Sequence, residues 1–368
     1  MAGPTTGLAE RAGLPYAFTE TQDASERGPR RRSFGGIAMG TDVTGRTNAS
    51  AGMPRSQSAV VGVDIGGTSI KMGLVTPSGE VLATSSLRTG ALDGEAAFAE
   101  VLAAVTSLAR EGGLEPEALA GVGVDVPGVV LPDGTLDMAP NVTLDLSGLL
   151  GYLRTSLPGT PLATLNDCNA AALGETWVGA GHGADSLVMV ALGTGVGAGV
   201  VVDGKVTAGA HGAAGEIGHL CVEPGETNPC NCGCRGCLEQ YASARGLIRL
   251  YREACARDGA TEVPIAHATD ALAVFEAARA ENPQAREACE RIGAYLARAL
   301  SAVAVTVDPG AFVVGGGMCG GWDTFGDVCL RTYRELAISS CKATPIRVAA
   351  LGNKAGFLGA ARAVLTQA

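Results

Sequence analysis

Two stretches of this chain share one layout, in which a buried strand runs into a glycine-rich turn and then into a second strand. Residues 59–75 read AVVGVDIGGTSIKMGLV, and residues 186–206 read SLVMVALGTGVGAGVVVDGKV. Short apolar runs bounded by glycine turns predict strands. Helical periodicity follows each stretch, at residues 93–113 and again within 238–307. The chain therefore predicts an α/β fold of two similar halves, each a sheet with helices on its faces.

The length of 368 residues and the apolar content of 46% suffice for two medium-sized lobes with their own cores. Residues 1–58 are rich in Gly, Ser, Thr, Pro and Arg without helical or strand periodicity, which predicts a disordered extension or an over-long gene start. We expect one lobe at residues 59–165 together with a C-terminal helix at about 352–368. The second lobe is expected at residues 166–351.

Charge and cysteine usage narrow the class of protein. The net charge of -10 and the pI near 5.0 argue against a nucleic-acid surface, which needs clustered Lys and Arg. No apolar run reaches the roughly 18 to 20 residues of a membrane span, and no signal peptide opens the sequence. Four of the 11 cysteines form a C-x-C-x-C-x-x-C run, which favours metal binding over disulfides. We expect a cytoplasmic protein with neither nucleic-acid nor membrane partners.

Residues 215–239, GEIGHLCVEPGETNPCNCGCRGCLE, predict a zinc site. One nitrogen and three thiolates suit a closed, tetrahedral structural zinc. The predicted ligands are His219, Cys230, Cys232 and Cys237, with Cys234 as a competitor. Zinc would hold the loop at residues 219–237 in shape and fix the flanking carboxylates of Glu216 and Glu239. Fixed carboxylates can bind a polyol.

Both glycine turns are candidates for phosphate binding, because backbone N–H groups without side chains nearby can approach an anion. The predicted contacts are Asp64, Gly66, Gly67 and Thr68 in the first turn and Gly193, Thr194 and Gly195 in the second. Asp64 ends a strand and could hold Mg²⁺ through water. Taken alone, the first turn is equally well interpreted as a plain hairpin. A third turn, Gly315, Gly316 and Gly317, could receive adenine or simply connect a strand to a helix.

Asp167 is the candidate base for phosphoryl transfer to an alcohol. This reaction needs positioning, charge neutralisation and a carboxylate that accepts the hydroxyl proton. Asp167 follows the predicted strand PLATL at the start of a helix, beside Asn166. The alternative is that Asp167 only caps this helix.

The motifs D-I-G-G-T, N-D-C-N-A-A, G-T-G-V-G, G-E-I-G-H and C-N-C-G-C-R-G-C-L-E, in this order, resemble the ROK family of sugar kinases and repressors. The resemblance covers residues 60–365 and is strongest with the bacterial glucokinases of the family. It implies a two-lobed actin-like ATPase fold with an RNase H-like core, in which a hexose and ATP with Mg²⁺ meet in the cleft between the lobes. It also suggests a homodimer or homotetramer.

The resemblance assigns roles to particular residues. Asp167 corresponds to the base that deprotonates the sugar 6-hydroxyl. The sugar-contacting set is Asn166, Glu216, His219 and Glu239, with looser matches at Gly128 and Asn141. His219 would bind zinc through one ring nitrogen and a sugar hydroxyl through the other.

One departure from the family pattern concerns the first turn. Many members carry Lys or Asn directly after the threonine, whereas Ser69 stands here and the nearest basic residue is Lys71, which we predict to contact phosphate. The family also includes regulators with an N-terminal helix-turn-helix, but Gly and Pro interrupt residues 1–58 throughout. The alternatives to glucose phosphorylation are a kinase for N-acetylmannosamine, fructose, mannose or allose, or a sugar-responsive regulator.

Overall fold

The computed structural model describes residues 58–131, 134–138 and 142–367. The predictions made for residues 1–57 and for Asn141 therefore lie outside the described residues. Within the described ranges, no helix is both long and apolar enough to cross a membrane.

The first sheet combines an antiparallel meander with two parallel strands. Its strand order is β3-β2-β1-β4-β7. β1 pairs antiparallel with β2 and parallel with β4, which in turn pairs parallel with β7. The strands are β1 (Val60–Ile65), β2 (Ser69–Val75), β3 (Val81–Arg88), β4 (Gly121–Val126) and β7 (Leu162–Asn166). A separate hairpin joins β5 (Val129–Val130) to β6 (Leu136–Met138).

The second sheet repeats this arrangement, in the order β10-β9-β8-β11-β12. β8 pairs antiparallel with β9 and parallel with β11, just as β1 pairs with β2 and β4. The strands are β8 (Leu187–Leu192), β9 (Val196–Val202), β10 (Lys205–Val206), β11 (Ala311–Gly315) and β12 (Ile346–Val348). The prediction of an α/β fold with two similar halves is confirmed.

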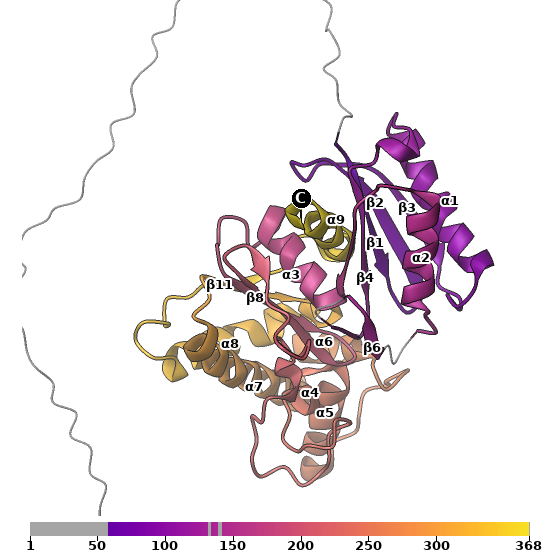
Figure 1. Ribbon diagram of the computed structural model, residues 1–368. Coiled ribbons are helices and arrows are strands. Elements are labelled where there is room, and N and C mark those ends of the chain that lie inside the picture. Colours follow the sequence, from indigo (N-terminus) through magenta and orange to yellow (C-terminus); the bar gives the residue numbers. More distant parts are fainter. Residues whose placement is uncertain (1–57, 132–133, 139–141, 368) are drawn as a thin grey trace, which may run out of the picture. The chain divides into compact units, whose positions relative to one another are not determined.

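Helices cover both faces of each sheet (Figure 1). α1 (Glu95–Glu111) and α2 (Leu146–Ser156) share a core with the outer face of the first sheet. α3 (Asp167–Val178) and α9 (Ala355–Gln367) pack on each other between the sheets, α9 against β1 and β4 and α3 against β8 and β9. The other face of the second sheet is covered by α5 (Ala244–Asp258), α6 (Ala271–Arg279), α7 (Pro283–Val307) and α8 (Trp322–Leu336).

The remaining helices are short and lie in connections. They are α4 (Glu239–Ala242) and the 3-10 turns η1 (Pro116–Ala118), η2 (Ile217–His219), η3 (Gly317–Gly321) and η4 (Gly352–Lys354).

Two glycines let α9 lie directly on the first sheet. A Cβ atom on Gly62 would lie 1.8 Å from the carbonyl oxygen of Phe357, and one on Gly123 would lie 1.9 Å from that of Ala360. Any side chain at either position would push the helix off β1 and β4. The glycines therefore fix the N-terminal end of α9 close to the ends of these strands.

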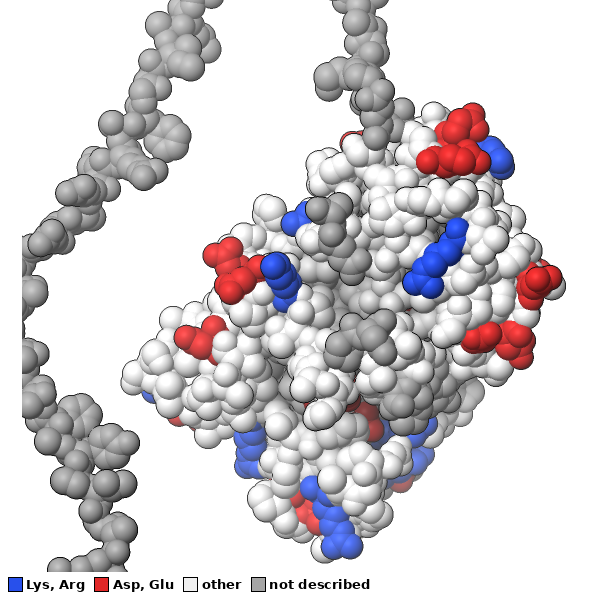
Figure 2. Space-filling view, viewed as in Figure 1, with Lys and Arg blue, Asp and Glu red and all other residues white. Residues whose placement is uncertain are grey.

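The charged residues of the described chain do not gather on the face seen in Figure 2. Acidic and basic side chains lie there in small, separate groups on a largely uncharged surface. This face offers no broad basic surface of the kind that a nucleic acid requires.

Candidate active site and metal centre

The junction of β7 and α3 holds the candidate base. β7 ends at Asn166, whose Oδ1 accepts hydrogen bonds from the backbone N–H groups of Cys168 at 2.9 Å and Asn169 at 3.1 Å. Asn166 is therefore the N-cap of α3, as expected from the preference of Asn for this position. The alternative interpretation, in which Asp167 serves as the cap, does not describe this helix.

Asn166 also fixes the carboxylate that follows it. Its Nδ2 donates to Oδ1 of Asp167 at 2.9 Å and to the carbonyl oxygen of Gly128 at 2.9 Å. Gly128 adopts a φ of 120°, a conformation that favours glycine. The hydrogen-bonding capacity of the Asn166 amide is thus taken up inside the protein.

Asp167 has one oxygen fixed and the other available. Its Oδ1 accepts from Asn166 and from the N–H of Cys168 at 2.8 Å, whereas its Oδ2 accepts from no N–H or O–H group of the described residues. The thiol of Cys168 also bonds this carboxylate. Burial raises the pKa of Asp167 above its ordinary value of 3.8, although these hydrogen bonds lower it. A carboxylate with a raised pKa and an oxygen that no amide or hydroxyl group occupies is suited to accept a proton.

A buried carboxylate that the sequence interpretation missed lies one strand away. The tetrapeptide VGVD occurs in both β1 and β4, and the strands align so that Gly62 pairs with Gly123 and Asp64 with Asp125. Register partners on parallel strands point to the same face. The repeated VGVD was the signal in the sequence that could have revealed Asp125.

Asp64, Asp125 and Asp167 form what we call the acidic row. Burial raises the pKa of Asp125 well above its usual range, and the charges of Asp64 and Asp167 raise it further. Burial also raises the pKa of Asp64, while Lys71, its partner on β2, lowers it. The Lys71 ammonium donates to Oδ1 of Asn353 at 3.4 Å. Lys71 is thus placed to offset part of the charge of the acidic row, and its predicted contact with phosphate stays a prediction.

The first glycine turn leaves backbone donors available. Gly66 donates to the carbonyl of Ser69 at 3.1 Å and closes the turn. The N–H groups of Gly67 and Thr68 have no hydrogen-bond partner in the described part of the chain. Such groups at an exposed turn can approach an anion. A Cβ atom on Gly356, in the first turn of α9, would lie 2.8 Å from Cγ of Asp64, so α9 begins directly against this carboxylate.

The second glycine turn meets the start of α3 and the zinc-side carboxylate. A Cβ atom on Gly197 would lie 2.5 Å from Sγ of Cys168, which places β9 against the residue after the candidate base. Oε2 of Glu239 accepts the N–H of Val196 at 3.0 Å. A Cβ atom on Gly195 would lie 2.3 Å from the same carboxylate oxygen. This turn therefore requires glycine at 195 to stay in contact with Glu239.

A cavity of about 450 Å³ opens beside the second turn. Its walls include Gly193, Thr194, Gly317, Met318, Leu272 and Phe275. The apolar side chains among them suit a flat heterocycle. Of the three glycines predicted to receive adenine, only Gly317 lines this cavity. Gly315 is buried in β11, and Gly316 has a φ of 88° and packs on the backbone of Leu192, so these two shape the turn.

The predicted zinc ligands converge. The ligand atoms of His219, Cys230, Cys232 and Cys237 all lie within 4.8 Å of one another, and the other sulfur atoms of the described chain are outside this group. Sγ of Cys230 is 3.9 Å from Nδ1 of His219, and Sγ of Cys232 is 3.7 Å from that of Cys237. Ligand atoms at about 2.3 Å from a tetrahedral centre are about 3.7 Å apart, so this set fits zinc.

The zinc segment, residues 219–237, is braced by fully paired side chains. The N–H of Cys237 donates to Gln240, whose amide donates to the carbonyl of Asn228 at 3.0 Å. Glu226 accepts from the N–H of Asn228 at 2.9 Å and from the hydroxyl of Tyr241 at 2.7 Å. These bonds, the first above all, lower the pKa of Glu226 to about 2.

Glu216 links the zinc segment to the candidate base. It precedes η2, the short turn that ends at His219. Its charge contributes to the raised pKa of Cys168, after burial and the adjacent Asp167 charge. A Cβ atom on Gly215 would lie 2.6 Å from the carbonyl oxygen of Ala198 in β9, and one on Gly199 would lie 2.4 Å from that of Cys168. Glu216 therefore lies near the start of α3, and the structure brings Asp167, Glu216 and Glu239 to one region.

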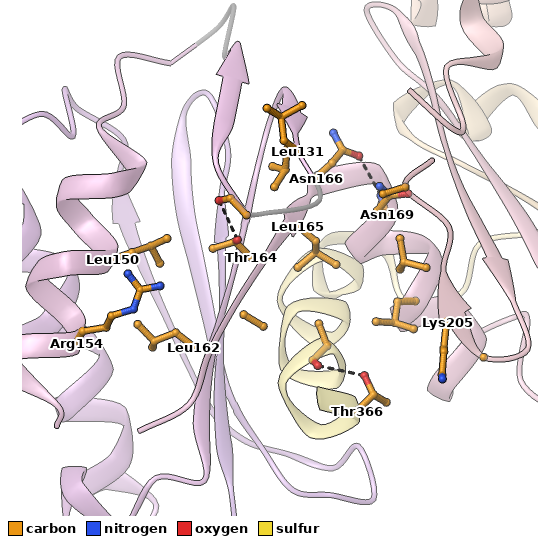
Figure 3. Close-up of a pocket in the computed structure, with 18 residues that line it drawn as sticks. Leu131, Leu150, Arg154, Leu162, Thr164, Leu165, Asn166, Asn169, Lys205 and Thr366 are labelled. Atoms are coloured by element: carbon orange, nitrogen blue, oxygen red, sulfur yellow. Dashed lines mark hydrogen bonds between the residues drawn. The ribbon is translucent and has the colours of Figure 1, made fainter. Parts of the chain in front are cut away.

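A second cavity, of about 610 Å³, borders β7 (Figure 3). Thr164 and Leu165 of β7, Arg154 of α2 and Lys205 of β10 lie around it. Among the predicted site residues, only Asn166 reaches its wall. This cavity is therefore not the one expected to receive the sugar.

The chain is similar to known proteins over most of its length. The model of the ROK family matches residues 60–367. A glucokinase of Halalkalibacterium halodurans is 35% identical over 306 residues, which cover 81% of this chain and 92% of that protein. The crystal structure of a ROK hexokinase from Thermus thermophilus aligns with a TM-score of 0.70 and 31% identity, covering 84% of this chain and 98% of that one. The crystal structure of a ROK family glucokinase from Streptomyces griseus, in complex with glucose and AMPPNP, aligns with a TM-score of 0.64 and 32% identity. The alignment covers 83% of this chain and 98% of that one.

The two sheets of equal strand order, with α3 and α9 between them, have the two-lobed actin-like ATPase fold of these neighbours. The fold class predicted from the sequence is thereby confirmed. The chain belongs to the ROK family, as its ordered motifs predicted.

Proposed function

We propose that this ROK-family chain is an ATP-dependent glucokinase, which transfers the γ-phosphate of ATP to the 6-hydroxyl of glucose. The observation that carries the proposal is that the amide groups of Asn166 and Cys168 hold only Oδ1 of Asp167, which leaves Oδ2 for a substrate hydroxyl. The names of the relatives, glucokinases at 32 to 35% identity over most of the chain, support glucose and ATP as substrates.

In the proposed reaction, Asp167 accepts the proton of the sugar hydroxyl as that oxygen attacks the γ-phosphorus. Its raised pKa brings the carboxylate closer to the operating pH, which improves a general base. Asn166 holds Oδ1 in place, so that Oδ2 is the accepting atom. We assign Asn166 to positioning the base, since its amide is already engaged.

The remaining sugar contacts are proposed for Glu216, Glu239, His219 and the backbone at Gly128. His219 turns Nδ1 toward the thiols, which leaves Nε2 as the nitrogen for a sugar hydroxyl. Glu239 already bonds the N–H of Val196 through Oε2, so Oε1 is the atom proposed to meet the sugar. Asn141 is kept as a proposed contact from the resemblance alone.

ATP is proposed to place its base in the cavity of about 450 Å³ and its phosphates at the two glycine turns. Mg²⁺ would neutralise charge on the phosphates that react. Among this chain's residues, Asp64, the last but one of β1 before the first turn, is proposed to hold the cation. The unpartnered oxygens of Asp125 beside it fit a place where a cation binds.

A structural zinc is proposed at His219 and the three thiolates. The ligand distances carry this proposal, and the zinc would keep Glu239, two residues after Cys237, against the second glycine turn. We further propose that one lobe consists of residues 59–165 with 352–368 and the other of residues 166–351. We also propose that the protein is a homodimer or homotetramer. Its proposed location is the cytoplasm, where ATP is available and thiolates stay reduced.

The test is a coupled assay of ADP release with glucose, N-acetylmannosamine, fructose, mannose and allose, run with and without a zinc chelator. We expect glucose to give the highest kcat/KM and the chelator to abolish it. If glucose binds but no hexose stimulates ADP release, the chain is a sugar-responsive regulator and the proposal fails. A higher kcat/KM with another hexose would replace glucose as the substrate.

A further inference from the structure

Asp125 is the carboxylate of the acidic row to which the proposed reaction assigns neither a proton nor a ligand role. Its side chain is 0% exposed, and no N–H or O–H donor of the described residues bonds Oδ1 or Oδ2. The polar group beside it is the carboxylate of Asp64. Burying a carboxylate without partners is strongly unfavourable, because the group loses its hydration and gains nothing in return. Groups of this kind in native structures usually have a partner that is not a protein group, such as a water or an ion.

The position of Asp125 points to the kind of partner. It is the register partner of Asp64 on β1, and on its other side it pairs with Leu165, two residues before Asp167. Gly62 and Gly123, two residues before the two aspartates, both face α9. Residues two apart on a strand share a face, so Asp64 and Asp125 point to the side where α9 begins and where the first glycine turn lies.

The charges along the acidic row do not balance. Lys71 is the cation that acts on both Asp64 and Asp125, and it stands against three carboxylates. The acidic row thus places three carboxylate groups around one ammonium group, which gathers more acidic oxygen atoms at one place than Lys71 can pair. Mg²⁺ takes oxygen ligands and is commonly held by one or two carboxylates together with phosphates and water.

We propose that Asp125 is a second protein carboxylate for the divalent cation, so that Asp64 and Asp125 hold it as a pair at the adjacent ends of β1 and β4. The proposal rests on the proposed kinase function only for the identity of the nucleotide. The acidic row then has two parts. Asp64 and Asp125 hold the cation, and Asp167 accepts the proton.

The rival explanation is a neutral Asp125 whose proton bonds Asp64. The two explanations differ in the effect of Asp125→Asn. An asparagine amide can donate the hydrogen bond that a protonated carboxyl would donate, but it carries no negative charge and is a poor ligand for a hard cation. Asp125→Asn therefore separates cation binding from hydrogen bonding.

The experiment measures Mn²⁺ binding to the zinc-loaded full chain in the presence of ADP, by the electron paramagnetic resonance signal of free Mn²⁺. Asp125→Asn should weaken Mn²⁺ binding by about tenfold to a hundredfold, the range seen when residues supporting a metal are removed. The matched control is Asp203→Asn, an exposed aspartate with φ 51° in the turn before β10, a conformation that Asn also tolerates. It should bind Mn²⁺ like the wild type.

A melting experiment on the same zinc-loaded proteins provides a second readout. Without a divalent cation, Asp125→Asn should melt at or above the wild-type temperature, because an unpartnered buried charge is gone. With Mg²⁺ and ADP, the wild type should gain more stability than the variant. If Asp125→Asn does not fold, Asp125→Ala takes its place in both measurements.

Unchanged Mn²⁺ affinity in Asp125→Asn overturns the proposal, as does a variant that melts lower without cation and binds Mn²⁺ normally. The proposed function is judged separately, because Mn²⁺ binding with ADP does not depend on the hexose. A wild type that phosphorylates glucose while Asp125→Asn keeps full Mn²⁺ affinity would refute only this inference.

Discussion

The zinc segment and the acidic row differ in how their carboxylate side chains are hydrogen-bonded. In the zinc segment, Glu226 is nearly buried and fully paired, by the N–H of Asn228, the hydroxyl of Tyr241 and the guanidinium of Arg249 at 3.2 Å. In the acidic row, no N–H or O–H donor of the described residues bonds the buried Asp125 or Oδ2 of Asp167. The first carboxylate has its pKa lowered and the others have theirs raised.

This contrast distinguishes carboxylates that stabilise the structure from carboxylates that are available for a reaction. Paired carboxylates hold a loop in one conformation, because removing any partner leaves a buried group unsatisfied. Unpaired carboxylates remain available to a proton, a cation or a substrate. Glu239 joins the two regions, since it follows the zinc segment and bonds the second glycine turn at Val196.

The largest expected effect is a loss of turnover from a change in the acidic row. Asp167→Asn removes the proton acceptor but keeps the shape of the side chain. We expect kcat to fall by about a hundredfold to ten-thousandfold, the usual contribution of a general base. Glucose affinity should change little, because Asn can still accept from Cys168. Steady-state kinetics gives kcat, and calorimetry gives the glucose Kd. A kcat near that of the wild type would remove Asp167 from its role.

The pH dependence of kcat/KM should also reflect the role of Asp167. Only the ionised Asp167 accepts a proton, so kcat/KM should fall about tenfold per pH unit below its pKa. Because burial raises this pKa, the acid limb should lie above pH 3.8. The measurement is kcat/KM against pH at saturating Mg·ATP, with zinc content determined at each pH. A profile that is flat down to pH 3.8 while zinc stays bound would contradict the assignment.

A smaller effect is expected from the zinc segment. Cys232→Ser should lose zinc and weaken glucose binding by about tenfold to a hundredfold, since the metal orients His219 and Glu239. Cys234→Ser is the matched control, because Cys234 lies in the same loop but outside the group of four ligand atoms. It should keep one zinc per chain and normal glucose affinity. Elemental analysis and calorimetry decide, and equal zinc content in both variants would refute the ligand set.

The smallest effect is on stability. Glu226→Gln should lower the free energy of unfolding by about 1–2 kcal/mol, because it breaks a paired, nearly buried network. Since the pKa of Glu226 is lowered from 4.5 to about 2, its contribution is complete above pH 4.5 and declines as the pH falls toward 2. The difference between variant and wild type should shrink accordingly in urea unfolding.

The control for this change is Glu253→Gln, which alters the exposed partner of the same Arg249. Its effect should stay within about 0.5 kcal/mol, as for other surface ion pairs. Equal losses in Glu226→Gln and Glu253→Gln would show that the paired network in the zinc segment contributes no more than a surface contact.

The features that could be predicted from the sequence are those that depend on residues close together in the chain. The strands and glycine turns follow from short apolar runs, and the four predicted metal ligands converge because three of them lie within eight residues of one loop. Asp125 was missed because its meaning depends on strand register, which brings together two VGVD segments far apart in the chain. The positions of Gly315 and Gly316 were also beyond the sequence, since only the tertiary packing shows that Gly315 lies against Met189 and Gly316 against the backbone of Leu192, outside the lining of the cavity.

The central claim is that Asp167 takes the proton from the hydroxyl that is phosphorylated. A crystal structure with glucose and a non-hydrolysable ATP analogue tests it most directly. We predict that the glucose 6-hydroxyl oxygen lies within hydrogen-bond reach of Oδ2 of Asp167, about 2.6–3.2 Å away. Glucose bound with that oxygen turned away from Asp167, toward another side chain, would contradict the account.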